Sequence, residues 1–210
     1  MVQFTLFGIR VRVEPLFWLT IALLGSLGED LQEAESLLRI ALFVLAAFFS
    51  VLVHEMGHAL TIRKFGYPTN VVLTTMGGYA TMPRGVLSRK QSFLVSAAGP
   101  GFQILLGFIV LFGLGPFVGG QSELFVGFIT DLYIVSFVWA IFNCMPIYPL
   151  DGGQMLAAAI GPRRNKALYM VGMITSGALG LLAISMGQIF LILFMGMFFY
   201  QNFQNYKQLQ

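Results

Sequence analysis

The chain has 210 residues, of which 57% are hydrophobic and only 10% are charged, and its formal net charge is +3. Soluble domains have roughly 45–50% apolar residues, so this composition excludes an ordinary soluble protein and predicts an integral membrane protein. The single cysteine, Cys144, excludes an intramolecular disulfide and is predicted to pack as a small hydrophobic residue. The sequence has no internal repeat and no long linker, which predicts a single domain over residues 1–210.

The chain begins with alternating apolar and basic residues, which predict an N-terminal strand within residues 1–14. A membrane-spanning helix needs about 20 apolar residues, and about six stretches are candidates, the first and the last of them short. They are residues 16–27, 37–62, 93–114, 124–143, 167–186 and 189–203. Between the second and third of these, residues 66–83 are rich in β-branched residues around Gly77-Gly78 and predict a β-hairpin. The predicted fold class is an all-α polytopic membrane protein with a small antiparallel β-sheet on the cytoplasmic face of the membrane.

The charges between the predicted helices indicate the orientation in the membrane. Eleven of the twelve Lys and Arg residues fall on one side if both termini are cytoplasmic, and Arg39 is the exception. Four acidic residues, at positions 29, 30, 33 and 35, fall on the other side. Because Lys and Arg accumulate in cytoplasmic loops, both termini are predicted to be cytoplasmic.

Both histidines of the chain lie in the second predicted helix, in the sequence His54-Glu55-Met56-Gly57-His58. Residues four apart share one face of a helix, so the two imidazoles can bind one metal ion. Glu55 lies next to the first of them without having to be a ligand, which is the arrangement of HExxH zinc peptidases. The alternative is that both histidines are polar links between helices. This alternative leaves three ionisable groups, which are costly within a membrane, without a common partner.

A catalytic zinc site takes three protein ligands, so a third ligand must come from elsewhere in the chain. The candidate carboxylates are Glu123, Asp131 and Asp151. The metal would lie about 13 Å from the cytoplasmic end of the histidine-bearing helix. Asp151 follows the cytoplasmic end of the fourth predicted helix, whereas Asp131 enters that helix from the outer side. The depth of the metal in the membrane therefore favours Asp151, which lies in a loop at residues 143–153. The alternative is that Asp151 is only the N-cap of the short helix that begins beside it.

Two segments of the chain resemble the signature motifs of the site-2 protease family, the intramembrane zinc metalloproteases. They are HEMGH at residues 54–58 and NCMPIYPLDGG at residues 143–153. The segments VEPLFWL near the start, MGGYATM at 76–82 and SAAGPGFQ at 96–103 also resemble this family, most closely its sporulation-protease branch. The chain departs from the family pattern at Gln103 and Ser136, where asparagines are expected.

The resemblance implies an enzyme, a zinc metalloendopeptidase that hydrolyses a peptide bond within or near a transmembrane segment of a membrane protein. It implies His54, His58 and Asp151 as Zn²⁺ ligands, Glu55 as the catalytic base, and Asn143 as a group that holds the substrate or the oxyanion. The residues expected to contact substrate are Val71, Gly77, Gly78, Tyr79, Asn143 and Pro146. The implied partners are a transmembrane protein substrate and the lipid bilayer of a prokaryotic cell, with the active site toward the cytoplasmic side. No nucleic-acid partner is expected.

Two other classes of function remain as alternatives. A metal or proton transporter would need a series of polar groups across the membrane, and outside the histidine cluster Asp131 is the main acid within a predicted span. A catalytically inactive relative could bind membrane helices, but it would have no need of Glu55.

Overall fold

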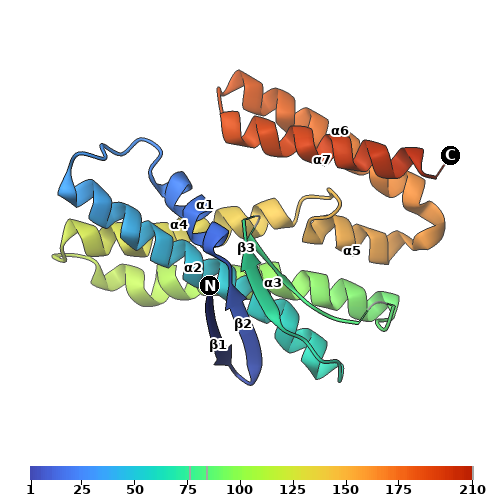
Figure 1. Ribbon diagram of the computed structural model, residues 1–210, viewed down its shortest axis with the longest axis horizontal. Helices are drawn as coiled ribbons and strands as arrows, with labels where there is room; N and C mark the ends of the chain where they lie inside the picture. The colour runs from blue at the N-terminus through green and yellow to red at the C-terminus, as the bar shows by residue number, and fades with distance from the viewer. Residues whose placement is uncertain (76, 84, 210) are drawn as a thin grey trace. The chain divides into compact units, whose positions relative to one another are not determined.

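The computed structural model describes residues 1–75, 77–83 and 85–209 (Figure 1). The first residue of the MGGYATM segment, Met76, and one of the predicted loop cations, Arg84, lie outside these residues, as does Gln210. The chain forms two compact units. One consists of Met1–Arg84 and Ala98–Ala140, and the other of Gly85–Ala97 and Ile141–Gln210.

All six predicted spans are helical. The helices are α1 (Pro15–Gly25), α2 (Ala34–Lys64), α3 (Arg89–Ile109), α4 (Glu123–Asn143), α6 (Asn165–Ser185) and α7 (Ile189–Lys207). Helix α3 continues into a π-helical turn, η1 (Val110–Leu114), and a 3-10 turn, η2 (Gly115–Phe117).

Four helical stretches of the described chain are long and apolar enough to cross a membrane. They are Ala34–Lys64, Arg89–Phe117, Glu123–Asn143 and Pro162–Ser185. Helix α1 has 11 residues, which cover only about 16 Å at 1.5 Å per residue. Helix α7 ends in the polar sequence QNFQNYK, which lowers its mean hydropathy. The structure therefore supports a polytopic membrane protein with four candidate spans, and the predicted number of six is not confirmed.

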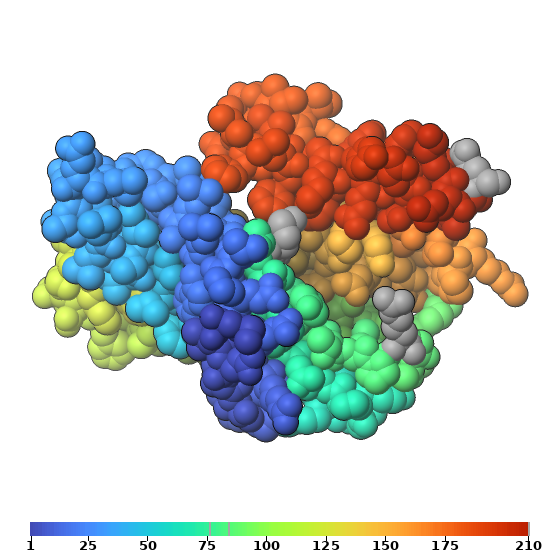
Figure 2. All heavy atoms as spheres, viewed as in Figure 1, coloured from blue at the N-terminus to red at the C-terminus, as the bar shows by residue number. Residues whose placement is uncertain are grey.

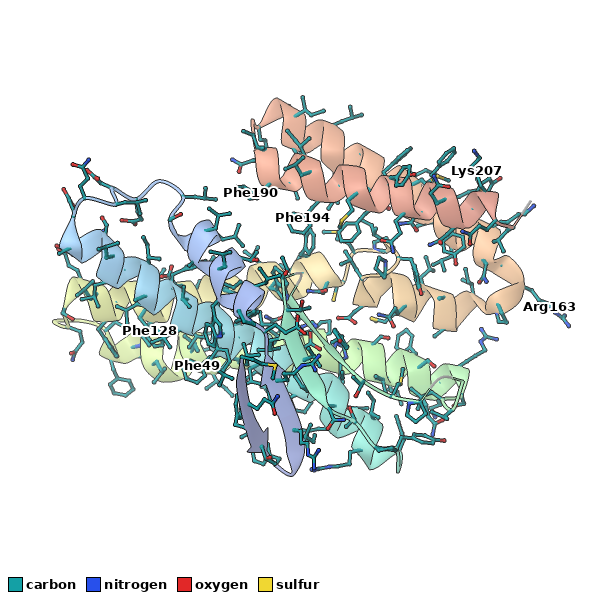
Figure 3. All side chains as sticks on the ribbon, in the orientation of Figure 1. Phe49, Phe128, Arg163, Phe190, Phe194 and Lys207 are labelled. Carbon is teal, nitrogen blue, oxygen red and sulfur yellow. The ribbon has the colours of Figure 1, made fainter. Side chains whose placement is uncertain are left out.

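Large apolar side chains lie exposed on several helices, as for Phe49 of α2 and Phe190 of α7 (Figure 3). A soluble monomer rarely exposes so much apolar surface. The exposed side chains are consistent with helices that contact lipid.

The first unit contains a four-stranded sheet in the order β1 (Val2–Leu6), β2 (Ile9–Val13), β3 (Val71–Thr74), β4 (Gly77–Ala80). Strands β3 and β4 form the predicted antiparallel hairpin. The prediction of one N-terminal strand is wrong, because β1 and β2 form a second hairpin around a two-residue turn at Phe7-Gly8. Both turn residues have positive φ, 48° and 75°, as a type I′ turn requires.

The prediction of a wholly antiparallel sheet is also wrong, since β2 and β3 pair in parallel. A parallel pair needs a long crossover connection, and the chain supplies it through α1 and α2. The alternation in β2 was interpreted correctly: Ile9, Val11 and Val13 are buried and the two arginines between them are exposed. The exposed face of the β1–β2 hairpin lies on the surface of this unit (Figure 2). Its buried face packs with α1 and α2 in one hydrophobic cluster.

In the second unit, the long helices α6 and α7 lie side by side (Figure 1). They follow α5 (Asp151–Ile160) and a 3-10 turn, η3 (Pro162–Arg164). The core is formed by Ile147, Met195 and Phe198. Arg89 donates hydrogen bonds to the carbonyls of Ala158 and Ala159. A cation is therefore placed at the C-terminal end of α5, where it interacts favourably with the helix dipole.

The loop between α4 and α5 is a series of turns and bends. Asn202 of α7 is fully buried, and its Nδ2 donates to the carbonyl of Tyr148 in this loop at 2.7 Å. Gly172 of α6 leaves the space for this side chain, since a Cβ there would lie 2.4 Å from Asn202 Oδ1. Cys144 is exposed, so the prediction that it packs as a small hydrophobic residue is wrong.

Candidate metal centre

The HEMGH segment lies within α2, and its three ionisable side chains are all buried. His54, Glu55 and His58 are 2%, 4% and 8% exposed. The two Nε2 atoms of the histidines are 3.1 Å apart. This distance confirms that the i, i+4 spacing brings the imidazoles together, as the sequence predicted.

Two glycines make room around these imidazoles. A Cβ at Gly57 of α2 would lie 2.6 Å from the carbonyl oxygen of Ala98 in α3. A Cβ at Gly99 of α3 would lie 2.2 Å from His58 Nε2 and 2.9 Å from His54 Nε2. The two helices therefore approach backbone to backbone, and the absence of a side chain at residue 99 leaves space beside both nitrogens.

Strand β4 lies directly against the glutamate of the motif. A Cβ at Gly78 would be 2.6 Å from Glu55 Cγ, and one at Gly77 would be 2.8 Å from Trp139. Tyr79 is 49% exposed. The described strands give β4 one partner, β3, so β4 is an edge of the sheet.

Val71, which was expected to contact substrate, does not lie at that edge. It is fully buried in β3 and is paired with Val11 on one side and Ala80 on the other. Its backbone is thus paired with a neighbouring strand on both sides, so Val71 offers no free edge to a substrate.

Asp151 is the first residue of α5, and the cap position is Leu150. The alternative in which Asp151 is the N-cap therefore does not hold. The next two glycines pack on the preceding loop, because a Cβ at Gly152 would lie 2.1 Å from the carbonyl oxygen of Cys144. Asp151 is 7% exposed. Asn143 ends α4 and Pro146 follows in the loop, and both are half-buried.

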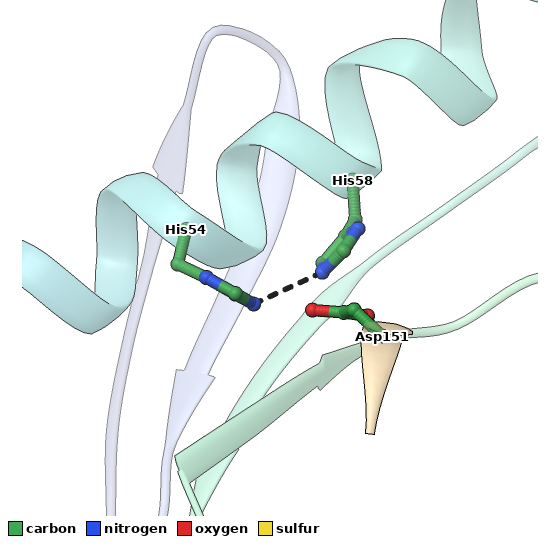
Figure 4. Close-up of side chains that lie close together, drawn as sticks. All are labelled: His54, His58 and Asp151. Carbon is green, nitrogen blue, oxygen red and sulfur yellow. Dashed lines mark hydrogen bonds between the residues drawn. The ribbon is translucent and has the colours of Figure 1, made fainter. Parts of the chain in front are cut away.

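One group of His, Cys, Asp and Glu side chains in the described chain could hold a metal ion, and it consists of His54, His58 and Asp151 (Figure 4). Their ligand atoms lie within 4.8 Å of one another. Two imidazole nitrogens and one carboxylate oxygen are a donor set that suits zinc and leaves a fourth position open for a catalytic site. The residues present therefore fit this metal.

A buried set of polar side chains behind His54 was missed by the functional reading of the sequence. Gln103 of α3, Ser50 of α2 and Ser136 of α4 are each 0% exposed, and Gln103 Oε1 lies 2.8 Å from His54 Nδ1. Two features of the sequence could have indicated this set. Ser50 precedes His54 by one helical turn, and Gln103 and Ser136 are the positions that depart from the family pattern.

The comparisons with known proteins agree with the motifs. Residues 42–122 match the model of peptidase family M50. The chain is 31% identical over 199 residues to a candidate zinc metalloprotease of Synechocystis, covering 88% of this chain and 51% of that protein. It is 32% identical over 152 residues to the stage IV sporulation protein FB of Bacillus subtilis, covering 70% of this chain and 46% of that protein. These matches confirm the resemblance to site-2 proteases.

A solved structure supports the same fold. The site-2 protease from Methanocaldococcus jannaschii is similar with a TM-score of 0.65 and 22% identity, over 98% of this chain and 94% of that one. The chain spans about half or less of the length of the curated relatives named above, at 51% and 46%.

Proposed function

We propose that this protein is an intramembrane zinc metalloprotease that hydrolyses a peptide bond within or near a transmembrane segment of a membrane-protein substrate. The observation that carries the proposal is the buried group of His54, His58 and Asp151 with Glu55 beside it in α2. The similarity to peptidase family M50 supports the same activity.

His54, His58 and Asp151 would hold Zn²⁺ through two nitrogens and one oxygen. When bound, zinc polarises the scissile carbonyl and lowers the pKa of a coordinated water toward about 7. The buried side chains exclude bulk water around this position, which strengthens electrostatic interactions with the substrate.

Glu55 would act as the general base. It takes a proton from the attacking water and delivers it to the amide nitrogen of the leaving group. Its contact with Gly78 supports this role, because the backbone of β4 passes next to the carboxylate-bearing side chain. A peptide held along β4 would therefore run close to the base.

The edge strand β4 is the proposed substrate-binding element. A helical substrate hides its carbonyls in its own hydrogen bonds, so cleavage requires a locally unwound segment. Such a segment can add to an exposed edge by main-chain hydrogen bonds. Gly77, Gly78 and Tyr79 belong to this edge, whereas Val71 can support it only from the interior of the sheet. Asn143 and Pro146 are proposed to contact the substrate or its oxyanion from the loop that leads to Asp151.

The proposed location is the membrane of a prokaryotic cell, with both termini and the active site toward the cytoplasm. The distribution of basic residues supports this orientation. His54 lies ten residues before Lys64, the last residue of α2, which is about 15 Å of helix rise. A metal at this depth needs a path for water from that side.

One experiment distinguishes the protease from the two alternatives, a transporter and a catalytically inactive relative. Detergent-purified wild type, Glu55→Gln and Asp151→Ala are assayed for zinc content and for cleavage of a model single-span substrate. We expect wild type to carry about one zinc per chain and to cut. Glu55→Gln should keep zinc and be inactive, and Asp151→Ala should lose zinc. Cleavage by Glu55→Gln at the wild-type rate would refute the proposed protease mechanism.

A further inference from the structure

Four polar side chains form a continuous buried hydrogen-bonded chain that connects α2, α3 and α4 behind the metal centre. The members are His54, Gln103, Ser50 and Ser136, and none is more than 2% exposed. The chain ends at the backbone carbonyl of Leu132, to which Ser136 Oγ donates at 2.6 Å. Buried polar groups are costly unless they are hydrogen-bonded. A fully hydrogen-bonded set of this kind therefore favours one arrangement of the three helices.

The donor and the acceptor of every hydrogen bond in this series can be assigned by starting from the carbonyl of Leu132, where the series ends. The carbonyl of Leu132 can only accept, so the hydroxyl proton of Ser136 is used there. Ser136 Oγ must then accept from Ser50 Oγ, 3.1 Å away. With its own proton used, Ser50 Oγ accepts from Gln103 Nε2 at 2.8 Å.

The amide of Gln103 is thereby oriented with its oxygen toward the histidine. Gln103 Nε2 also donates to the carbonyl of Ser50 at 3.4 Å. Because a carbonyl oxygen only accepts, this bond requires the same orientation of the amide. Gln103 Oε1 lies 2.8 Å from His54 Nδ1. Because an amide oxygen only accepts, Nδ1 carries a proton, and in the neutral imidazole the lone pair is then on Nε2.

We propose that Gln103, held in orientation by Ser50 and Ser136, is a positioning residue that fixes the tautomer and ring orientation of His54 so that Nε2 is presented to the metal. Metal-binding histidines depend on such an acceptor at the other ring nitrogen, and its loss typically costs about 10–100-fold in metal affinity. This inference rests on the proposed zinc site. It assigns a role to the two positions at which the chain departs from the family pattern.

The test measures Zn²⁺ affinity by competition with a chelator in detergent, independently of proteolysis. Gln103→Met keeps the length of the side chain but removes the amide, and we expect Zn²⁺ binding to weaken by about 10–100-fold. Gln103→Glu retains an acceptor for Nδ1, and we expect affinity at or above that of the wild type. A merely structural role for residue 103 would impair both variants, and Glu more than Met, because it buries a charge.

Ser136→Ala tests the far end of the chain and remains informative if Gln103→Met does not fold. Without Ser136 as acceptor, the hydroxyl of Ser50 can turn toward Gln103 and reverse its amide. We expect a smaller loss of Zn²⁺ affinity than in Gln103→Met. The matched control is Ser176→Ala in α6, because Ser176 is equally buried and donates to the carbonyl of Gly172 at 2.6 Å, outside this chain of bonds.

The outcomes separate this inference from the proposed function. If wild type binds no Zn²⁺, the proposed function fails. If wild type binds Zn²⁺ and Gln103→Met binds it within about threefold of wild type, well short of the expected loss, the positioning role is overturned. Equal losses in Gln103→Met and Gln103→Glu, or in Ser136→Ala and Ser176→Ala, also overturn it.

Discussion

Gly99→Ala is the substitution with the most direct predicted effect on the metal centre. The added methyl group would lie 2.2 Å from His58 Nε2 and 2.4 Å from His58 Cε1. A nonbonded contact of this kind needs about 3.5 Å, so the imidazole of His58 must move by about 1.3 Å or the helices must separate. Separation is opposed by the contact between Gly57 and the backbone of Ala98.

A displacement of this size is large for a metal ligand. Metal–ligand distances tolerate deviations of only about 0.2 Å. We therefore expect Gly99→Ala to weaken Zn²⁺ binding by more than the roughly 10–100-fold that follows loss of a residue supporting a ligand. Cleavage of the model substrate should fall with zinc occupancy.

The assay is chelator competition for Zn²⁺ together with cleavage, on purified Gly99→Ala and Gly101→Ala. Gly101 is the matched control, because it lies two residues further along α3 with nothing within 4 Å of its Cβ position. We expect Gly101→Ala to bind zinc and cut like the wild type. If Gly99→Ala bound zinc with wild-type affinity, the claim that His58 needs a residue without a side chain at position 99 would be refuted.

Three further predictions concern strand β4, the loop before α5 and the metal itself. Gly78→Ala places a methyl group 2.6 Å from Glu55 Cγ, so we expect kcat to fall while zinc content, measured by metal analysis, stays near one per chain. Asn202→Leu removes the hydrogen bond to the Tyr148 carbonyl, so the loop before α5 should become more sensitive to limited proteolysis, whereas the exposed Gln201→Ala should not change it. Treatment with a strong chelator should abolish cleavage, and added Zn²⁺ should restore it; activity that survives complete zinc removal would contradict the proposed metal dependence.

The sequence was most informative where periodicity acts locally. The i, i+4 spacing of His54 and His58 and the alternation in β2 each follow from one element, and the structure has both. The β1–β2 hairpin was missed because Phe7-Gly8 lacks the Asn-Gly or Asp-Gly signal of a type I′ turn. The parallel pairing of β2 with β3 joins residues about 60 positions apart, and such a contact is decided by how α1 and α2 return the chain to the sheet.

The polar residues behind His54 illustrate a second limit. Ser50, Gln103 and Ser136 stand singly in apolar helices, and each can be satisfied locally or point elsewhere. Their common partner becomes visible only when three helices are packed together. Hydrophobic patterning predicts that these helices are buried or lipid-exposed, but not which polar atoms meet.

The close approach of helix α3 and strand β4 to the HEMGH motif explains why glycine occurs where it does. Gly57 lets α2 contact α3, Gly99 leaves space beside both imidazoles, and Gly78 lets β4 contact the glutamate. Each position would place a Cβ less than 3 Å from a neighbouring atom. The geometry of the centre therefore depends on side chains that are absent as much as on the ionisable groups themselves. For this reason, alanine substitutions at these glycines test the proposed site without removing any of its functional groups.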